Sequence, residues 1–428
     1  MQYWKRNISG AVILSGLLMQ VVPQAAASPM AGNSVFDSVQ KAVASDGADG
    51  DDFGWSVSID GDTALVGVYG DDDNGSMSGS AYVFTRVGGV WKQQAKLTPS
   101  DGKSKDYFGW SVSVDGDTAV IGAYAQDNNN SDSDYDCGAA YIFTRSGGVW
   151  RQEAKLAAGG RATHFGYAVS LSGDTALIGT QVPSGEKGIA YVFSRSASGW
   201  SQEAMLTPEP EDREVNDHFG FAVSLDGDSA LIGAYGMDSS KGVAYIFSRD
   251  ETGWSQQTKL IASDRNNSDE FGYAVAVEGD TALIAAPYDD DNGSGSGSVY
   301  IFADSGSGWS RQTKLTASDA AAGDQFGYTV SLSGDTALIG APTNDDNGTD
   351  SGSAYIFARS GGVWHQQMKL NASDASSQDT FGRAVSVDGD TALIGAPHAD
   401  GHDNGSGAVY FFGPKNAVVT PVIMYLLN

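Results

Sequence analysis

Aspartate and asparagine residues are concentrated in short polar segments that recur along the chain. Hard cations such as Ca²⁺ take about six to eight oxygen ligands from flexible Asp, Asn and backbone groups, so these segments predict Ca²⁺ as a bound ion. An alternative is that Asp, Asn, Gly and Ser only form turns, because their side chains bond their own backbone. No segment holds a complete calcium loop of about twelve residues with its terminal Glu. The metal-ligating candidates are Asp71, Asp73, Asp289, Asp291, Asp345, Asp346, Asp400 and Asp403.

A second group of residues breaks the regularity of the sequence and is predicted to contact a ligand. Asp132 and Asp134 lie in a long acidic loop, and Arg161 and His164 lie in a segment that lacks the acidic residues found elsewhere. Arg383 stands where six related segments carry an aromatic residue. Catalysis normally requires one asymmetric site, so an enzyme hypothesis would start from Arg161, His164 and Arg383. No nucleophile elbow, Cys–His arrangement or phosphate loop is present, so no catalytic residue is assigned and binding is expected rather than catalysis.

These residues are positioned by an internal repeat. The pair Phe-Gly recurs every 52 to 57 residues, beginning at Phe53, Phe108, Phe165, Phe219, Phe271, Phe326 and Phe381. A period of this size is typical of propellers and solenoids.

Each copy except the last contains four short apolar runs, which in the fifth copy are residues 271–277, 281–286, 298–302 and 309–315. The first run alternates bulky and small residues, as expected of a strand at the crowded centre of a radial array. The second is nearly all apolar, which indicates a strand covered on both faces. A two-residue turn that ends in Gly joins them, so they form an antiparallel hairpin.

The last copy stops after Phe412 and lacks a fourth run, whereas residues 36–46 precede the first Phe-Gly and match the fourth-run pattern. We therefore expect an all-β, seven-bladed β-propeller of four-stranded antiparallel blades, closed by an N-terminal strand that completes the last blade. Closure leaves no exposed sheet edge.

Two sets of aromatic residues repeat at fixed positions, which favours packing over sugar binding. One set lies on the fourth runs and contains Phe36, Trp91, Trp150, Trp200, Trp254, Trp309 and Trp364. The other lies on the first runs and contains Trp55, Trp110, Tyr167, Phe221, Tyr273 and Tyr328. We expect the second set to lie in the core between blades.

The ends of the chain and its charge bear on where it acts. Residues 1–27 have the basic, apolar and small-residue regions of a signal peptide, residues 28–413 form the propeller, and residues 414–428 form a tail too short to cross a bilayer. We expect a secreted, extracellular, periplasmic or cell-surface protein with no transmembrane segment after signal removal. The net charge of −28 excludes nucleic acid as a partner and favours cations.

The Phe-Gly pairs, with Ile339-Gly340-Ala341-Pro342 and Ile394-Gly395-Ala396-Pro397 following at fixed spacing, resemble the FG-GAP repeat. That resemblance covers about residues 35–413 and implies the seven-bladed propeller of integrin α-subunits and bacterial surface proteins. The calcium loop that many members carry between the first two strands is replaced here by a tight turn. We expect a binding or adhesion module whose acidic loop face takes cations and a protein or carbohydrate ligand. The alternatives are a structural envelope scaffold and a polysaccharide-acting lyase or glycosidase.

Overall fold

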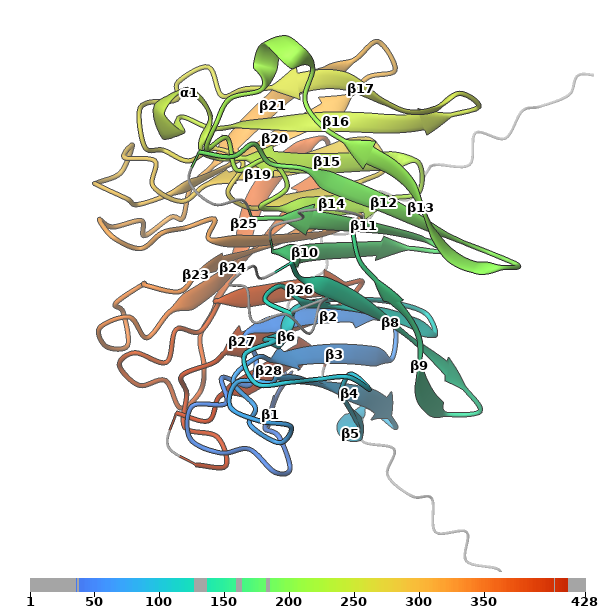
Figure 1. Ribbon diagram of the computed structural model, residues 1–428. Coiled ribbons are helices and arrows are strands. Elements are labelled where there is room, and N and C mark those ends of the chain that lie inside the picture. The colour runs from blue at the N-terminus through green and yellow to red at the C-terminus, as the bar shows by residue number, and fades with distance from the viewer. Residues whose placement is uncertain are drawn as a thin grey trace, which may run out of the picture. The chain divides into compact units, whose positions relative to one another are not determined.

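Seven four-stranded antiparallel sheets are arranged as blades in the computed structural model (Figure 1). This arrangement confirms the expected all-β fold class and the seven-bladed propeller. The structure describes residues 36, 38–126, 137–158, 164–181, 185–403 and 405–414. All of them belong to the unit Val35–Asn428.

The strands of each blade follow one another from the central channel outward. They are, in blade 1, β2 (Ser56–Asp60), β3 (Thr63–Val68), β4 (Ser80–Val87) and β5 (Val90–Leu97); in blade 2, β6 (Phe108–Asp115), β7 (Thr118–Ala123), β8 (Ala139–Ser146) and β9 (Val149–Leu156); in blade 3, β10 (Phe165–Ser172), β11 (Thr175–Thr180), β12 (Ala190–Ser196) and β13 (Gly199–Leu206); in blade 4, β14 (Val223–Asp226), β15 (Ser229–Ala234), β16 (Val243–Asp250) and β17 (Gly253–Leu260); in blade 5, β18 (Val275–Glu278), β19 (Thr281–Ala286), β20 (Ser298–Asp304) and β21 (Trp309–Leu315); in blade 6, β22 (Thr329–Ser333), β23 (Thr336–Ala341), β24 (Ser353–Ser360) and β25 (Val363–Leu370); and in blade 7, β26 (Ala384–Asp388), β27 (Thr391–Ala396), β28 (Ala408–Gly413) and β1 (Ser38–Ala42). Two single turns, η1 (Pro210–Asp212) and α1 (Met237–Ser240), are the helical elements of the described residues.

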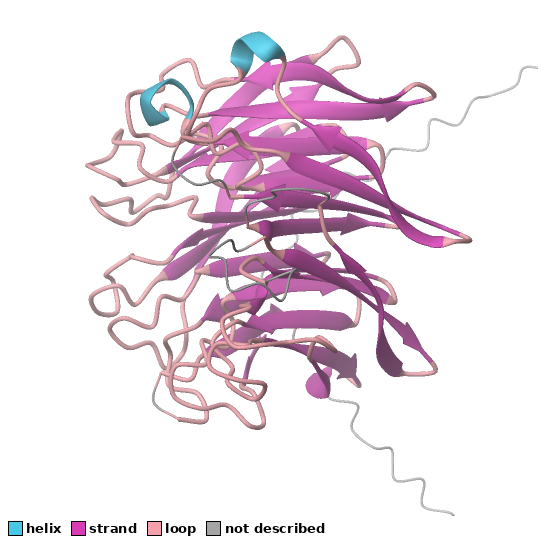
Figure 2. Ribbon diagram, viewed as in Figure 1, coloured by secondary structure: helices cyan, strands magenta, loops and turns pink. Residues whose placement is uncertain are grey.

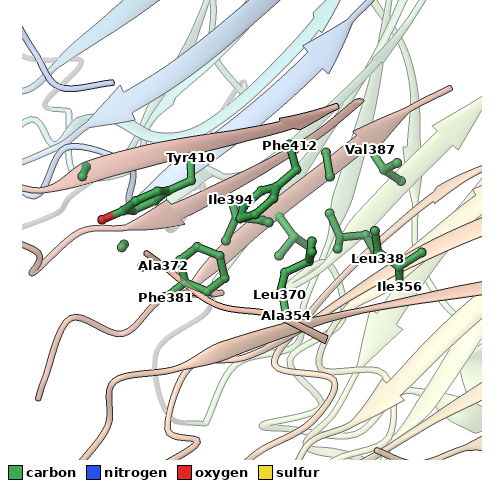
Figure 3. Packing of buried hydrophobic residues seen from close by; sticks show 14 of the residues in the cluster. Leu338, Ala354, Ile356, Leu370, Ala372, Phe381, Val387, Ile394, Tyr410 and Phe412 are labelled. Carbon is green, nitrogen blue, oxygen red and sulfur yellow. The ribbon is translucent and has the colours of Figure 1, made fainter. Parts of the chain in front are cut away.

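The hydrophobic core lies between neighbouring blades. The Phe of each Phe-Gly pair is fully buried, and Phe381 packs edge-on against Tyr410 with ring centroids 5.4 Å apart (Figure 3). Leu338 and Ile356 of blade 6 belong to the same cluster as Ile394 of blade 7. Because each blade exposes an apolar face that only its neighbour can cover, burial of these faces drives the blades together.

First and last blades are in direct contact, so the blades form a ring. Strand β2 contacts β26 in the same way that β2 contacts β6 and each inner strand contacts the next. The hairpin between first and second strands repeats this relation in hydrogen bonds: Gly61 N donates to Asp388 Oδ2 at 2.8 Å, and Gly116 N to Asp60 Oδ2 at 2.7 Å. Equivalent bonds join every neighbouring pair. The turn that the sequence predicted therefore also ties the blades together.

The N-terminal strand β1 is hydrogen-bonded to β28 in antiparallel register, with Gln40 opposite Phe411. The Gln40 side chain exchanges two hydrogen bonds with the backbone of Trp91 in blade 1, at 2.7 and 2.9 Å. Lys41 Nζ lies 2.6 Å from Asp374 Oδ2. The segment thus contacts blade 7 through its backbone and blade 1 through a side chain.

Glycine is required where one blade's loop meets the next blade. The first blade's Phe53 forms a parallel bridge with Gly407 of blade 7. Gly407 has a φ of +92°, and a Cβ there would lie 2.3 Å from the Phe53 carbonyl oxygen. Any side chain at Gly407 would push these two blades apart.

Loops gather on one face of the propeller, which we call the loop face (Figure 2). It is made by the connections between second and third strands and by the linkers that lead into each Phe-Gly pair. Since each first strand starts at this face, the residues around each Phe-Gly pair lie where the central channel opens.

Candidate functional site

The inner strands of all seven blades surround a central cavity of about 280 Å³. Its lining alternates aromatic and small residues. Of its residues that the structure describes, one is charged, Arg383. The lining set is Trp55 to Val57, Trp110 to Val112, Tyr167 to Val169, Phe221 to Val223, Tyr273 to Val275, Tyr328 to Val330 and Arg383 to Val385.

Seven side chains, one from each blade, form a closed circle in this cavity, which we call the central ring. Its members are Trp55, Trp110, Tyr167, Phe221, Tyr273, Tyr328 and Arg383, and all are partly exposed. Successive aromatic rings lie 4.9 to 5.4 Å apart between centroids, at tilted angles. Such tilted contacts stabilise each pair by about 0.5–1.5 kcal/mol beyond burial.

Arg383 closes the circle in the place of a seventh aromatic residue. Its Cζ lies 3.9 Å from the ring centroid of Trp55 and 4.9 Å from that of Tyr328. The π-electron faces of both rings attract the guanidinium. Among the described residues, however, no acceptor lies within hydrogen-bond distance of its N–H groups. The cavity therefore contains a guanidinium that is held by two rings but has no hydrogen-bonded counter-ion.

A second circle surrounds the loop-face opening. The residue before each Phe-Gly pair has a left-handed backbone, with φ between 52° and 61°. Six different residue types occupy this position in the seven blades, although the backbone is the same; they are Asp52, Tyr107, His164, His218, Glu270, Gln325 and Thr380, which we call the mouth residues. A non-glycine residue with positive φ is uncommon, and its recurrence shows that the repeat imposes it. The chemistry of the opening is thus set residue by residue on a fixed frame.

One part of the mouth is polar and lies beside Arg383. His398 Nε2 is 3.7 Å from Asp52 Oδ1, and His398 Nδ1 is 3.3 Å from the hydroxyl of Thr380. Burial raises the pKa of the Asp52 carboxyl above its ordinary value, although nearby Tyr69, His398 and Arg383 favour its charged form. These groups form a cluster of donors and acceptors.

The part formed by blades 2 to 4 is aromatic. Tyr107 stacks on Tyr124, with centroids 5.2 Å apart and planes 5° apart, and His218 stacks on Tyr235 at 4.5 Å and 6°. His164 meets Tyr124 edge-on at 5.3 Å. Burial raises the pKa of Tyr235 to about 12, so its hydroxyl stays a hydrogen-bond donor at neutral pH.

Burial disfavours the charged forms of two mouth residues. The pKa of Glu270 is raised to about 7 by burial, and the pKa of His218 is lowered for the same reason. Desolvation disfavours the charged form of either group. Near neutral pH the opening is therefore less negative than its sequence suggests.

Four of the predicted metal ligands surround lysine ammonium groups. In blade 1, Lys96 Nζ is 2.7 Å from Asp71 and 2.6 Å from Asp73. In blade 5, Lys314 Nζ is 2.8 Å from Asp289 and 2.5 Å from Asp291. The first Asp of each pair is buried and also accepts hydrogen bonds from serine and tyrosine hydroxyls.

The remaining four candidates lie in blades 6 and 7. Asp346 pairs with Lys369, and Asp345 Oδ1 accepts a hydrogen bond from Asp350 N at 2.8 Å. Asp400 Oδ1 accepts one from Gly405 N at 3.0 Å, and Asp403 lies 3.8 Å from His402. Within the described part of the chain, no group of three or more His, Cys, Asp or Glu side chains is arranged to hold a metal ion. Ca²⁺ binding by these loops stays a prediction.

The predicted ligand-contacting residues divide into two groups. Arg383 belongs to the central ring and His164 to the mouth, where His164 Nδ1 lies 3.0 Å from the Gln181 carbonyl oxygen. Asp132, Asp134 and Arg161 fall outside the described residues, as does the predicted signal peptide, residues 1–27.

Sequence reasoning placed the first-strand aromatic residues wrongly, in the core between blades; they line the channel instead. Of the bulky residues in the fifth copy's first run, Tyr273 lines the channel, whereas Phe271 and Val277 lie in the hydrophobic core between blades 4 and 5. The outer-strand tryptophans do pack as expected: Trp91 stacks on Phe411 at 4.5 Å. Asp52, Tyr69 and His398 were missed, although the variation of the residue before each Phe-Gly pair was a usable signal.

Comparison with known families gives a match over most of the chain. The family model described as FG-GAP repeat matches residues 36–84, 91–143, 150–193, 200–247, 254–302, 309–357 and 364–412. No curated protein matched the chain.

Proposed function

Because the chain belongs to the FG-GAP repeat family along seven consecutive repeats, we propose that it is a ligand-binding module of the cell surface or extracellular space, and that its ligand is a carbohydrate bound at the loop-face opening of the central channel. The observation that carries this proposal is the central ring, in which six partly exposed aromatic side chains surround an open cavity.

Aromatic faces and hydroxyl-binding groups lie together at this opening. A sugar presents apolar C–H faces and polar hydroxyl edges, so it needs flat apolar surfaces beside a few donors and acceptors. Trp55 and Trp110 supply such surfaces, and Asp52 and His398 supply polar partners. A mostly apolar pocket with few convergent polar groups is the usual form of a small-ligand site.

The proposed location rests on the sequence features of residues 1–27 and on the family, whose repeats occur in extracellular and cell-surface proteins. Within the described residues, no helix has the length and apolarity needed to span a membrane. Secretion is tested by determining the N-terminus of the protein recovered from the medium or the cell surface.

The test of function is a binding screen of the purified full chain against immobilised oligosaccharides. We expect selective binding that is lost in Trp110→Ala and retained in Trp309→Ala. Trp309 is a partly exposed tryptophan of an outer strand, so it controls for a general effect of removing an indole.

Three outcomes would overturn the proposal. Binding lost in Trp309→Ala but not in Trp110→Ala would move the site to the outer strands. Binding to proteins and not to sugars would assign a protein ligand. Release of reducing or unsaturated ends from a bound polysaccharide would make the chain an enzyme.

A further inference from the structure

We propose that Arg383 binds the carboxylate of an acidic sugar residue, a uronic acid, inserted into the central ring. This inference rests on the carbohydrate-binding function proposed above and specifies the chemical class of the sugar. It names a specificity that the aromatic rings alone do not provide.

The first observation is the asymmetry of the central ring. Six blades place Trp, Tyr or Phe at this position, and blade 7 places Arg383. An aromatic residue at the seventh position would give a uniform apolar ring. The substitution instead puts one positive charge into a cavity in which, among its described lining residues, no other is charged.

The second observation is the bonding state of this charge. Removing a charge from water is unfavourable unless it gains a partner. Trp55 and Tyr328 compensate part of that loss through cation–π contacts at 3.9 and 4.9 Å. They satisfy none of the guanidinium N–H donors, and the described residues bring no acceptor to them. The planar guanidinium matches a carboxylate through two parallel hydrogen bonds.

The third observation is the size of the cavity and what lies beside it. A volume of about 280 Å³ is close to the lower end of ligand pockets, so the cavity suits a single sugar unit rather than a run of a chain. Asp52, Tyr69, His398 and Thr380 lie at the opening on the Arg383 side. They are placed to bond sugar hydroxyls while the carboxylate reaches Arg383.

Charges around the site limit the kind of acidic sugar. The charge of Asp52 interacts electrostatically with Arg383, but no ion pair joins these two described side chains. The chain as a whole has a net charge of −28, which repels a dense polyanion at long range. The site therefore fits an isolated uronic acid, at a branch or chain end, on an otherwise neutral glycan.

The experiment compares two forms of one probe by calorimetry. The probe is a xylotetraose with a single glucuronic acid branch, and its partner is the same compound with the carboxyl group reduced to an alcohol. Wild-type protein is expected to bind the acidic form about 10- to 100-fold more tightly, the value of a charge-assisted pair of hydrogen bonds. In Arg383→Tyr, which gives blade 7 a residue that blades 3, 5 and 6 already use, this ratio should fall to about one.

Control variants separate a specific effect from a folding defect. Arg359→Gln removes an arginine of the third strand β24, far from the channel lining, that is paired with Asp335 at 2.6 Å, and it should keep the wild-type ratio. Arg383→Lys should give an intermediate ratio, because it keeps the charge and loses the planar fork. Melting of each variant confirms that it is folded.

The outcomes distinguish failure of the uronic acid inference from failure of the carbohydrate-binding proposal. Equal wild-type affinity for both forms of the probe overturns the uronic acid inference and leaves carbohydrate binding intact. An unchanged ratio in Arg383→Tyr places the carboxylate elsewhere and also overturns it. Absence of binding to either form, with no sugar bound in the wider screen, overturns both.

Discussion

At the scale of single residues, the most informative side chains are lysines at one matching position of the fourth strands, each opposite a tyrosine of the third strand. Lys96, Lys314 and Lys369 each carry their ammonium group to the loop face and into a cluster of carboxylates. Blade 3 has Met205 in the same register, and the linker before that blade, residues 157–163, contains no acidic residue. The lysine and its acidic partners are present or absent together.

This pairing predicts a competition between ammonium and metal. Lys96→Met leaves Asp46, Asp71 and Asp73 without their shared cation, so we expect a loss of about 3 kcal/mol in unfolding free energy. Millimolar Ca²⁺ should restore more stability to this variant than to wild type, because carboxylates released from the lysine become available to the ion.

Melting with Ca²⁺ and with chelator measures this competition. Lys259→Met is the control, since Lys259 pairs with Asp212 at 2.7 Å in a partly exposed position, where loss of the pair costs about 1 kcal/mol or less. Equal Ca²⁺ responses in Lys96→Met and wild type would contradict the prediction.

At the scale of elements, the linkers between blades contain two kinds of aspartate, whose pKa values are shifted in opposite directions. Asp101 pairs with Lys155 and Tyr141; although burial opposes the shift, these hydrogen bonds lower its pKa. Asp106, five residues later, is buried, and burial raises its pKa to about 6. Stability from Asp101 is present above its unfolded pKa and is lost as the pH falls. Stability associated with protonated Asp106 is present at low pH and is lost as the pH rises.

Asp106→Asn isolates the second effect. In the wild type, Lys103 N donates a hydrogen bond to Asp106 Oδ2 at 2.8 Å. The asparagine side-chain oxygen can still accept this hydrogen bond, but asparagine is never charged. Wild type and variant should have equal unfolding free energies near pH 3.5, and the variant should become more stable between pH values of about 4 and 6, by up to about 3 kcal/mol. Denaturant titrations across this range measure the difference. A variant that is less stable than wild type at pH 8 would contradict the assignment.

The strands and turns of the blades were largely predictable from the sequence. The site at the channel opening was predictable only in part. The repeat, the hairpin turns at Gly61 and Gly116, and the buried second strands follow from local pattern, which is why the blades were expected correctly. The direction that Trp55 faces is not a local property, because a first strand has both an axial side and an interblade side. The partners of Lys96 depend on loops that converge only once the blade has formed.

At the scale of the whole molecule, the N-terminal strand makes contacts on both sides of the ring seam. It pairs with β28 and, through Gln40, bonds to Trp91. Deletion of residues 1–46 removes these contacts and exposes the backbone edge of β28. We expect a lower melting temperature by several degrees and self-association through the free edge.

Calorimetry and light scattering on this deletion check the expectation, with a chain that begins at Val35 as the control. The control keeps β1 and should remain monodisperse. A deletion that melts at the control temperature and stays equally monodisperse would show that the strand is dispensable for ring stability.

The proposed ligand site is the loop-face opening of the channel, inside the ring that Arg383 completes. A crystal structure of the full chain with the singly branched acidic xylo-oligosaccharide tests it most directly. We expect a uronic acid within the central ring, with its carboxylate on Arg383 and its ring faces against Trp55 or a neighbouring aromatic side chain. A saccharide seated on the outer-strand tryptophans or on the opposite face, with an empty channel, would contradict it.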